Sequence, residues 1–436
     1  MPQLVGRESE LTELRAVYTN AATASVPRVV VVAGPDGIGK SALTNALEES
    51  VGSQARVLRA VAYPFDRLIP FALSARLPNL FEQLDRATRE RPAVVIIDDA
   101  HYADDESLAQ IAAMTQRLSN RPLLVVLARD DEDDRTLPIE TDATIALGEL
   151  DSRDARALAR AQYPGAAPDV LDAIVANAHG VPYELIAIAG AAARRGVDES
   201  DAVDRSSGAA IAKELAALPA PERLALQMSA LLPEPLEPAL FESASNFPID
   251  HSLTAAAIVE TIAMKIPLRR RIIDAIERRG LRTIRDRLLL AEQSLASGDG
   301  AFARATLLDL AFVANAEHLV RVVVWASERH VELGEPPDER FVDFYMNFFE
   351  ALMEERSYAQ AESIAALALS EEQHRELPHL GSLAALLVRA QWMVDRHEAA
   401  RASYERYARA FEDPTDLQVL RDAAPWLTKT AIRRPS

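Results

Sequence analysis

Residues 1–190 alternate short apolar, β-branched runs with stretches of helical pattern. The four clearest apolar runs cover residues 28–33, 55–62, 93–97 and 123–128. None of them alternates strictly between apolar and polar residues, as is typical of strands that are covered on both faces. Helical stretches lie between the runs, including residues 40–49 and 105–118. This order predicts an α/β domain with a parallel sheet.

The pattern changes after this domain. Residues 191–208 are small and charged, which is typical of a linker. Beyond them the strand pattern nearly vanishes, and helices rich in Ala, Leu, Glu and Arg dominate. The chain therefore divides into a P-loop-type α/β domain at 1–190, a linker at 191–208 and an all-α remainder.

Three helical segments in the second half share a spacing. Each has a ring residue three positions before an alanine: Phe302 and Ala305, Tyr358 and Ala361, His397 and Ala400. Small residues at such a spacing let paired helices approach closely, which favours helical-hairpin repeats of the tetratricopeptide kind over residues 291–425, with a tail at 426–436. An ordinary helical bundle is the alternative.

Composition narrows the classes of function. The 436 residues include 47 Lys and Arg against 66 Asp and Glu, a net charge of −19, which argues against a surface shaped for nucleic acid or anionic lipid. The absence of cysteine excludes disulfides, thiol nucleophiles and cysteine metal sites. The start is charged, unlike a signal peptide, and the longest apolar runs are well short of the roughly 18 residues of a membrane span. We expect a cytoplasmic protein.

The strongest chemical signal follows the first predicted strand and precedes a helical stretch. It is a complete G-x-x-x-x-G-K-S motif, the pattern of a phosphate-binding loop. The motif consists of Gly34, Pro35, Asp36, Gly37, Ile38, Gly39, Lys40 and Ser41. Its glycines allow several backbone N–H groups to face one anion, and the helix adds its positive end. We expect Lys40 to reach the β- and γ-phosphates and the Ser41 hydroxyl to bind Mg²⁺.

Two carboxylates follow a buried strand. Residues 93–97 are apolar, so Asp98 and Asp99 emerge at the carboxyl end of the strand, where ligands bind in open α/β sheets. We predict that Asp98 holds Mg²⁺ through water and that Asp99 orients or deprotonates the attacking water. An acidic turn in solvent is the alternative.

Arg129 ends the fourth predicted strand and can face the γ-phosphate, which a cation there would sense or stabilise. A surface arginine paired with Asp130 or Asp131 is the alternative. The acidic run 130–134 is interpreted as a solvated turn.

These segments together resemble the signal-transducing ATPases with numerous domains, the STAND class. Within that class the chain is most similar to the ATPase part of large LuxR-type bacterial regulators related to the maltose-regulon activator. The resemblance rests on VGRESEL at 5–11, the phosphate loop, IIDDAHYADDESL at 96–108, LLVVLARDD at 123–131 and HGVPYEL at 179–185. It covers residues 1–190 specifically and the remainder only by helical character.

The resemblance implies ATP or ADP with Mg²⁺ as ligands and further site residues. Gly6 and Arg7 would line the adenine pocket, Pro182 would lie near the base, and His251 would approach the β-phosphate of ADP. The family's GNP string here reads Gly-Val-Pro, and Ser252 replaces the proline that usually follows the histidine. Residues 209–290 would form a helical and winged-helix-like domain that closes over the nucleotide. His101 and Tyr102 match the family's His-aromatic pair, which would couple the metal site to a neighbouring domain; packing at the end of the strand is the alternative.

Two features bear on partners. Residues 265–287 hold nine basic residues and three acids, which we interpret as an internal face like the Arg-rich helix of the family, and direct DNA binding is not expected. The last residues lack the pattern of the helix-turn-helix that ends LuxR-type regulators. We therefore expect output through a protein partner bound by the C-terminal repeats, and the resemblance adds nucleotide-dependent self-association.

Two functions of different kinds remain. One is a nucleotide-dependent switch with slow ATP hydrolysis and a regulatory, transcription-related output. The other is a helical-repeat scaffold whose P-loop domain binds nucleotide for stability only. A truncated LuxR-type transcriptional regulator is a further alternative. No acceptor site supports a metabolic kinase.

Overall fold

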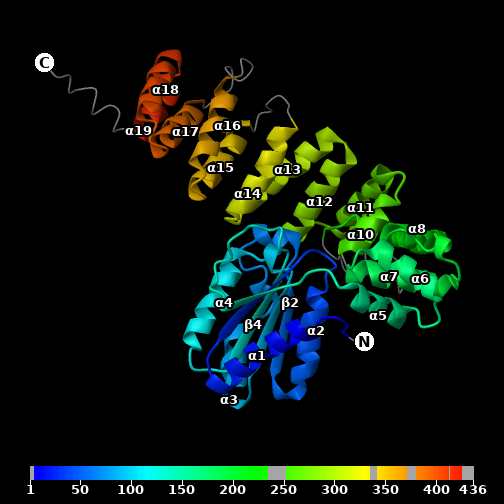
Figure 1. Ribbon diagram of the computed structural model, residues 1–436. Helices are drawn as coiled ribbons and strands as arrows, with labels where there is room; N and C mark the ends of the chain where they lie inside the picture. Colours follow the sequence, from blue (N-terminus) through cyan, green and yellow to red (C-terminus); the bar gives the residue numbers. More distant parts are fainter. Residues whose placement is uncertain (1–3, 234–251, 334–340, 371–379, 412, 425–436) are drawn as a thin grey trace. The chain divides into compact units, whose positions relative to one another are not determined.

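A computed structural model describes residues 4–233, 252–333, 341–370, 380–411 and 413–424. The chain divides into two compact units, Met1–Ile272 and Ile273–Ser436. Figure 1 shows the ribbon, with α/β layers at the N-terminal end of the sequence and helices throughout the rest.

The first unit is built on a five-stranded parallel sheet. Its strands are β1 (Arg28–Ala33), β2 (Arg56–Val61), β3 (Ala93–Asp98), β4 (Leu123–Arg129) and β5 (Ala143–Ala146). Their order across the sheet is β2-β3-β4-β1-β5, so β4 lies between the strand before the phosphate loop and the strand that ends at Asp98. All these pairs are parallel, which brings the carboxyl ends of the strands to one edge.

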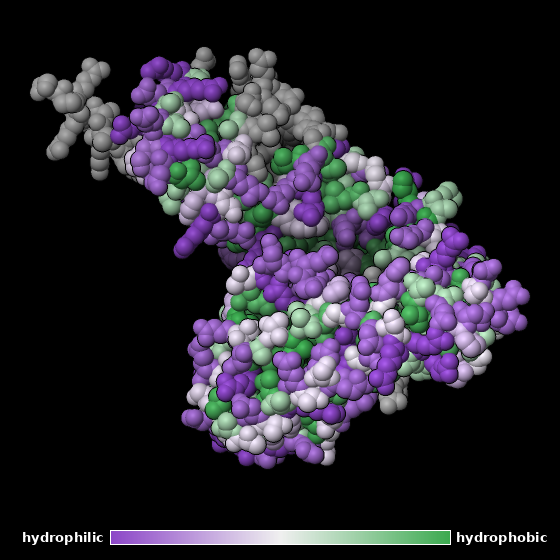
Figure 2. Space-filling model, in the orientation of Figure 1, coloured by the Kyte–Doolittle hydropathy of each residue, from purple (hydrophilic) through white to green (hydrophobic). Residues whose placement is uncertain are grey.

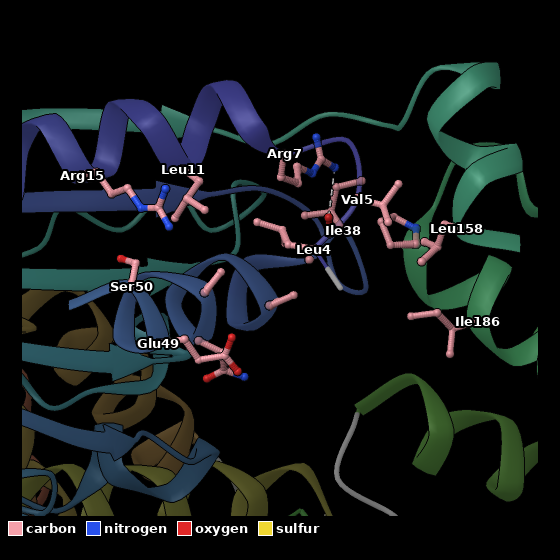
Figure 3. Close-up of a pocket in the computed structure, with 15 residues that line it drawn as sticks. Leu4, Val5, Arg7, Leu11, Arg15, Ile38, Glu49, Ser50, Leu158 and Ile186 are labelled. Carbon is pink, nitrogen blue, oxygen red and sulfur yellow. Dashed lines mark hydrogen bonds between the residues drawn. The ribbon is translucent and has the colours of Figure 1, made fainter. Parts of the chain in front are cut away.

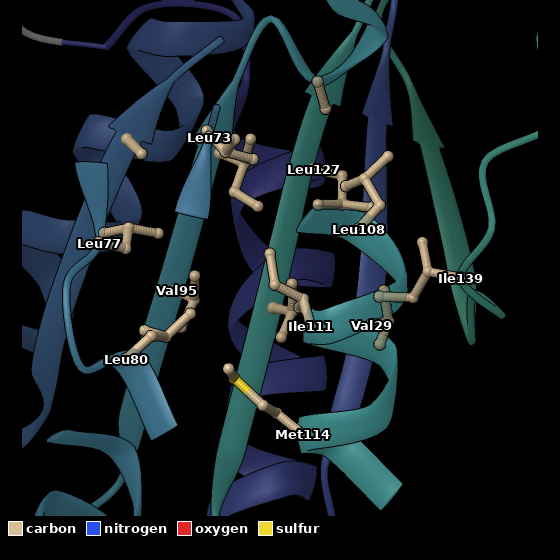
Figure 4. Packing of buried hydrophobic residues seen from close by; sticks show 14 of the residues in the cluster. Val29, Leu73, Leu77, Leu80, Val95, Leu108, Ile111, Met114, Leu127 and Ile139 are labelled. Carbon is tan, nitrogen blue, oxygen red and sulfur yellow. The ribbon is translucent and has the colours of Figure 1, made fainter. Parts of the chain in front are cut away.

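Apolar residues of each central strand alternate between two cores. In β1, Val29 and Val31 belong to one core, and Val30 and Val32 belong to the other. Both faces are therefore buried, which explains why the sequence shows continuous apolar runs instead of alternation. Figure 4 shows the first of these cores, where Ile111 and other helix residues pack over the strands.

Four helices cover the sheet. They are α1 (Glu8–Ala24), α2 (Lys40–Val51), α3 (Leu80–Glu90) and α4 (Asp105–Arg117). Helices α1 and α2 supply Leu14, Leu43 and Leu47 to the core that contains Val30, whereas α3 and α4 supply residues to the core of Figure 4. The result is a three-layer α/β domain, as the sequence predicts.

A group of short helices follows the sheet. They are α5 (Ser152–Gln162), α6 (Pro168–Ala178), α7 (Pro182–Arg195), α8 (Ser207–Ala217), α9 (Ala220–Ala230) and α10 (Ser252–Glu260). Helices α5–α7 share one apolar core, and α8–α10 share a smaller one. Within this group the predicted linker, 191–208, contains the end of α7 and the start of α8, and the Asp204 carboxylate in it is buried against Arg195 and Lys213.

Helix α11 (Lys265–Arg279) contains the division between the units. The second unit continues with α12 (Ile284–Ser297), α13 (Gly300–Ala316), α14 (Val320–Glu332), α15 (Phe341–Glu354), α16 (Tyr358–Ser370), α17 (Leu380–Met393), α18 (His397–Ala410) and α19 (Pro414–Ala423). The predicted all-α remainder is thus confirmed for the described residues beyond β5. Ala361 and Ala400 are buried at helix contacts, whereas Ala305 is exposed and Ala303 is buried in its place. The alanine of the predicted spacing is therefore buried in two of the three segments.

Three further observations bear on the sequence-based expectations. Strand β5 was not predicted, because Ala143–Ala146 is short and has only Ile145 fully buried. Among the described residues no helix is long and apolar enough to cross a membrane. Hydrophilic residues border apolar ones over the visible face of the sheet-containing unit (Figure 2). The predicted domain boundaries after residues 190, 208, 290 and 425 stay predictions.

Candidate nucleotide site

The loop between β1 and α2 has the backbone conformation of an anion cradle. Gly34, Gly37 and Gly39 all have positive φ, at 158°, 76° and 106°. At Gly34 a Cβ atom would lie 2.8 Å from the Leu147 carbonyl oxygen and 2.9 Å from Cγ2 of Ile38, so only glycine fits. Gly39 caps the N-terminus of α2, whose positive end therefore points at the loop.

Lys40 and Ser41 begin α2. The Lys40 side chain is buried, and its Nζ donates to the carbonyl oxygens of Gly34 at 2.7 Å and Pro35 at 3.0 Å. Its ammonium group lies 3.7 Å from the Asp36 carboxylate. Ser41 is exposed in the first turn of the helix. The ammonium group is thus held over the loop, where a phosphate would replace its carbonyl partners.

Asp98 lies on the α2 face of the sheet. It follows Val94 and Ile96 in alternation, and both of these belong to the core under α2. Its Oδ2 forms an ion pair with Arg59, while its buried Oδ1 has no hydrogen-bond partner among the described residues. Burial raises the pKa of the Asp98 carboxyl, and the Arg59 charge opposes this rise. A buried carboxylate oxygen without a partner is costly, so Oδ1 fits a site for a hydrated cation.

Asp99 differs from its neighbour in backbone and in acidity. It adopts the left-handed region at φ 52°, a strained conformation for a residue with a side chain. Burial, together with the negative charge of Asp98, raises the pKa of Asp99 to about 6, although Lys40 opposes the shift. A carboxylate with a pKa near the working pH is suited to accept a proton.

Arg129 is held by the turn that follows it. Its guanidinium donates to the carbonyl oxygens of Asp133, of Arg135 at 3.0 Å and of Asp130 at 3.3 Å. The side chain is thus bound within its own turn. The acidic segment 130–134 is therefore an organised turn around this guanidinium, and the sensing role stays a prediction.

His101 joins this turn to the end of β3. Its buried ring accepts a hydrogen bond at Nδ1 from the Asp130 backbone N–H at 3.3 Å, and it packs on Tyr102 with ring centroids 4.0 Å apart. Burial lowers the pKa of His101, so the neutral ring that can accept this bond is favoured. The Arg135 guanidinium completes the link by donating to the Ala103 carbonyl at 2.7 Å.

Arg7 joins the N-terminal segment to the phosphate loop. Its guanidinium donates to the carbonyl oxygens of Ile38 at 3.0 Å and of Gly148. The preceding Gly6 has φ 68°, and a Cβ there would lie 2.7 Å from Cβ of Asp154. The buried Arg7 Nε has no hydrogen-bond partner among the described residues, so a donor remains available to a ligand.

An apolar cavity of about 580 Å³ lies beside Arg7 and the loop. Helix α2 lines one side of it with Ala42, Asn45 and Ala46. The rest of its apolar lining consists of Leu4, Val5, Leu11, Ile38, Leu158, Pro182 and Ile186 (Figure 3). Most ligand pockets are concave and apolar with a few polar groups, and this one has the size for a nucleoside. Arg7 and Pro182 therefore line one cavity with the loop residues Ile38 and Gly39, whereas Gly6 precedes Arg7 and is not among the lining residues.

Helix α7 contacts the loop directly. Pro182 is its first residue, with Cγ 4.0 Å from the position of a Cβ on Gly39, and the Tyr183 N–H donates to the Gly37 carbonyl at 3.1 Å. Tyr183 also shares a hydrogen bond of 2.7 Å between its hydroxyl and Oγ1 of Thr254 in α10. His251 lies outside the described residues.

Sequence reasoning missed the partners of Asp98. They are Arg59 in β2 and Thr44 in α2, whose side chain also lowers the pKa of the Asp98 carboxyl, and, through Arg59, Glu48 in α2. The sequence did show Arg59 as a charged residue inside the apolar run 55–62, which indicates that it has a partner. Its partner depends on which strand lies beside β2, and this is decided by the fold.

A comparison with protein families supports the assignment of residues 34–41 as a phosphate loop. Residues 3–90 match a family model described as the AAA ATPase domain. No curated protein matches the chain. The match covers the phosphate loop and ends before β3, so it does not extend to the two carboxylates.

Solved structures give weaker similarities. One is a signal transduction ATPase with numerous domains (STAND) protein with a tetratricopeptide repeat sensor from Pyrococcus horikoshii, at 16% identity and a TM-score of 0.44, over 98% of this chain and 75% of that chain. The Aeropyrum pernix ORC1 protein in complex with DNA is similar at 18% identity and a TM-score of 0.36, over 53% of this chain and 73% of that chain. Pyrobaculum aerophilum CDC6P is similar at 17% identity and a TM-score of 0.38, over 53% of this chain and 75% of that chain. These TM-scores are too low to carry an argument about function. What stands is a match to the AAA ATPase domain over residues 3–90.

Proposed function

We propose that this chain is an ATP-binding switch with slow ATPase activity. The observation that carries the proposal is the meeting of three parts at one end of α2: the glycine cradle of residues 34–39, the carboxylates Asp98 and Asp99, and the apolar cavity beside Arg7. The cradle suits phosphates, the cavity suits adenine, and the carboxylates suit a cation and a water molecule. The match to the AAA ATPase domain supports the same assignment.

Each residue of the site receives a role in this proposal. Backbone N–H groups of residues 34–41, with the Lys40 ammonium, bind the β- and γ-phosphates. Ser41 and Asp98 hold Mg²⁺, which when bound neutralises phosphate charge. Asp99 accepts the proton of a water molecule as that water adds to the γ-phosphorus and the bond to the bridging oxygen breaks, leaving ADP and phosphate. Arg129 senses the γ-phosphate once it leaves its turn.

The contacts of α7 support a switch. A phosphate entering the cradle must draw N–H groups toward itself, and the Gly37 carbonyl that moves with them is bound to Tyr183. Tyr183 in turn is bound to Thr254, so a change in the loop has a direct route to α10. We propose that the helices after α10 receive or transmit a regulatory, transcription-related signal through a protein partner bound by residues 291–425, with nucleotide-dependent self-association.

The proposal is tested by separating binding from turnover. Asp99→Asn should keep the affinity for ATP and lower phosphate release by at least about 100-fold, as expected for the loss of a general base. Asp85→Asn, which changes a carboxylate of α3 that pairs with Arg89 and Arg121, serves as the matched control and should change neither. Equal phosphate release from Asp99→Asn and the unsubstituted protein would refute the role of Asp99.

A second function is favoured by one observation. The Arg129 guanidinium is bound by three carbonyl groups of its own turn, so Arg129 does not add a second cation beside Lys40 at the γ-phosphate. A protein that binds nucleotide for stability and never hydrolyses it would need no such cation. Stoichiometric binding of ATP with no phosphate release over many hours would establish this scaffold in place of the switch.

A further inference from the structure

Arg59 lies beside the proposed metal site although no motif contains it. It points to the α2 face of the sheet, because Val57 two residues earlier belongs to the core on that side. In the β2–β3 register Arg59 is opposite Ile96, and Val61 is opposite Asp98. A long side chain reaches such a diagonal neighbour easily. The fold therefore brings an arginine from an edge strand to the carboxylate of Asp98.

The contacts of Arg59 divide between its two sides. One terminal nitrogen, Nη1, pairs with Oδ2 of Asp98 and donates to Oγ1 of Thr44 at 3.2 Å. Nη2 donates to the Glu48 carboxylate at 3.2 Å. Thr44 and Glu48 lie in the turns of α2 that follow Ser41, away from the phosphate loop. The guanidinium thus holds Asp98 from positions further along α2 than the phosphate loop.

This arrangement leaves the other oxygen of Asp98 unused. Oδ1 is buried and has no hydrogen-bond partner among the described residues. The Asp98 side chain is only 10% exposed, so its orientation is set by its contacts with the protein. A carboxylate that is held at one oxygen and bare at the other has one defined direction in which to accept a bond.

The local charges favour a cation at Oδ1. Arg59 contributes +1, and Glu48 and Asp98 contribute −1 each, so the three groups sum to −1. Glu48 offsets the guanidinium charge, and its side chain is 44% exposed against 10% for Asp98. The uncompensated negative charge is therefore the more buried one, at Asp98. Arg59 orients this carboxylate without cancelling its attraction for a metal.

We propose that Arg59 is a positioning residue for the metal site: it holds Asp98 through Oδ2 and so directs Oδ1 toward the water shell of Mg²⁺ bound with nucleotide. This inference rests on the proposed function, because it assigns Asp98 to that metal. Residues that orient metal ligands through hydrogen bonds typically change metal affinity by about 10- to 100-fold when they are replaced.

The experiment measures the Mg²⁺ dependence of binding of a fluorescent mant-labelled ATP by the full chain. We expect Arg59→Met to raise the half-saturating Mg²⁺ concentration about tenfold, while affinity in excess EDTA stays the same. Mn²⁺ affinity, followed by the EPR signal of the free ion, should fall in parallel. Arg28→Met is the matched control: Arg28 is a strand arginine of the same sheet, paired with Asp142 at 2.8 Å at the amino end of β1.

Action through Asp98 is tested by a double-mutant cycle. In an Asp98→Asn background, Arg59→Met should change the Mg²⁺ dependence no further, because the oriented carboxylate is already absent. Additive effects of the two substitutions would overturn the proposal. A merely structural arginine would lower affinity in EDTA and in Mg²⁺ alike, which would also overturn it.

A second variant decides the matter if Arg59→Met does not fold. Glu48→Gln removes an exposed carboxylate and leaves the Arg59 charge uncompensated beside Asp98, so we expect the half-saturating Mg²⁺ concentration to rise about threefold. No change in this variant would overturn the positioning role. If the unsubstituted protein binds no nucleotide at any Mg²⁺ concentration, the proposed function itself is overturned. If the unsubstituted protein binds nucleotide and Arg59→Met has the same Mg²⁺ dependence, only the role of Arg59 is overturned.

Discussion

Asp99 combines two unfavourable features at one residue. Its backbone is in the left-handed region, and its carboxyl is buried beside Asp98. Neither feature helps the protein to fold, since a left-handed side-chain residue costs about 1–2 kcal/mol and a raised pKa disfavours the ionised form. Such costs are often found where function requires them. Asp99 is therefore the residue at which stability and the proposed activity should oppose each other.

The first prediction concerns the stability of an Asp99→Asn variant. The pKa of Asp99 is about 6 in the folded state against an ordinary value of 3.8, so between pH 3.8 and pH 6 the folded state binds more protons than the unfolded state. Asp99 therefore lowers stability as the pH rises through that window, and the cost is complete above pH 6 and absent below pH 3.8. We expect Asn to raise the free energy of unfolding by about 1–3 kcal/mol at pH 8. Urea unfolding at pH 8 and at pH 4 measures the difference; an equal gain at both would contradict the shifted pKa.

The same pKa predicts the pH dependence of turnover. Asp99 must be deprotonated to accept a proton, so phosphate release at saturating ATP should rise with pH and reach half its plateau near pH 6. A profile measured from pH 5 to 8 would show this rise. A rate that is flat across this range would mean that another group accepts the proton.

The third prediction concerns the fit at Gly6. Alanine there would meet Asp154 at 2.7 Å with φ at 68°, whereas Gly196 has nearly the same φ, 65°, and no atom within 4 Å of the added Cβ. Gly196→Ala should cost about 1–2 kcal/mol for the backbone alone. Gly6→Ala should cost roughly 1–3 kcal/mol more for the clash and displace Arg7 from the loop. Thermal unfolding of both variants isolates the clash; equal costs would show that the Gly6 segment yields easily.

At the scale of elements, the strands and the loop were predictable and the side-chain partners were not. Apolar runs identified β1 to β4. Strands β1, β3 and β4 are buried on both faces and leave almost no polar positions, whereas the edge strand β2 includes Arg59. The short β5 has too few buried residues to give such a signal. The partner of Arg59 depends on the β2–β3 register, and the turn that binds Arg129 depends on its carbonyl positions. Pattern reasoning places a residue at the end of a strand, but it does not show what that residue contacts.

Helix α7 is the element that should transmit a change in the loop. Tyr183→Phe removes the hydroxyl contact with Thr254 at 2.7 Å and keeps the backbone contact with Gly37. We expect unchanged ATP affinity but loss of the ATP-induced change in amide exchange of α10. Tyr163→Phe, which removes a comparable 3.0 Å bond from its hydroxyl to the Val197 carbonyl, should leave that change intact. An undiminished response of α10 in Tyr183→Phe would exclude this route.

At the scale of the whole molecule, the central claim is that nucleotide bound at the loop controls a largely helical protein. The sheet-containing unit carries every described residue of the proposed site, and the second unit is helical wherever it is described. A site formed by one unit can act on the other only if nucleotide is bound there. Nucleotide occupancy is therefore the claim on which the other predictions depend.

The most direct measurement is the nucleotide bound per chain. The purified protein is incubated with ATP and Mg²⁺, separated from free nucleotide, denatured and analysed by chromatography, alongside Lys40→Ala and the exposed-lysine control Lys213→Ala. We expect about one adenine nucleotide per chain for the unsubstituted protein and Lys213→Ala, and a loss of at least about tenfold for Lys40→Ala. Equal nucleotide content in all three proteins, or none in any, would contradict this expectation.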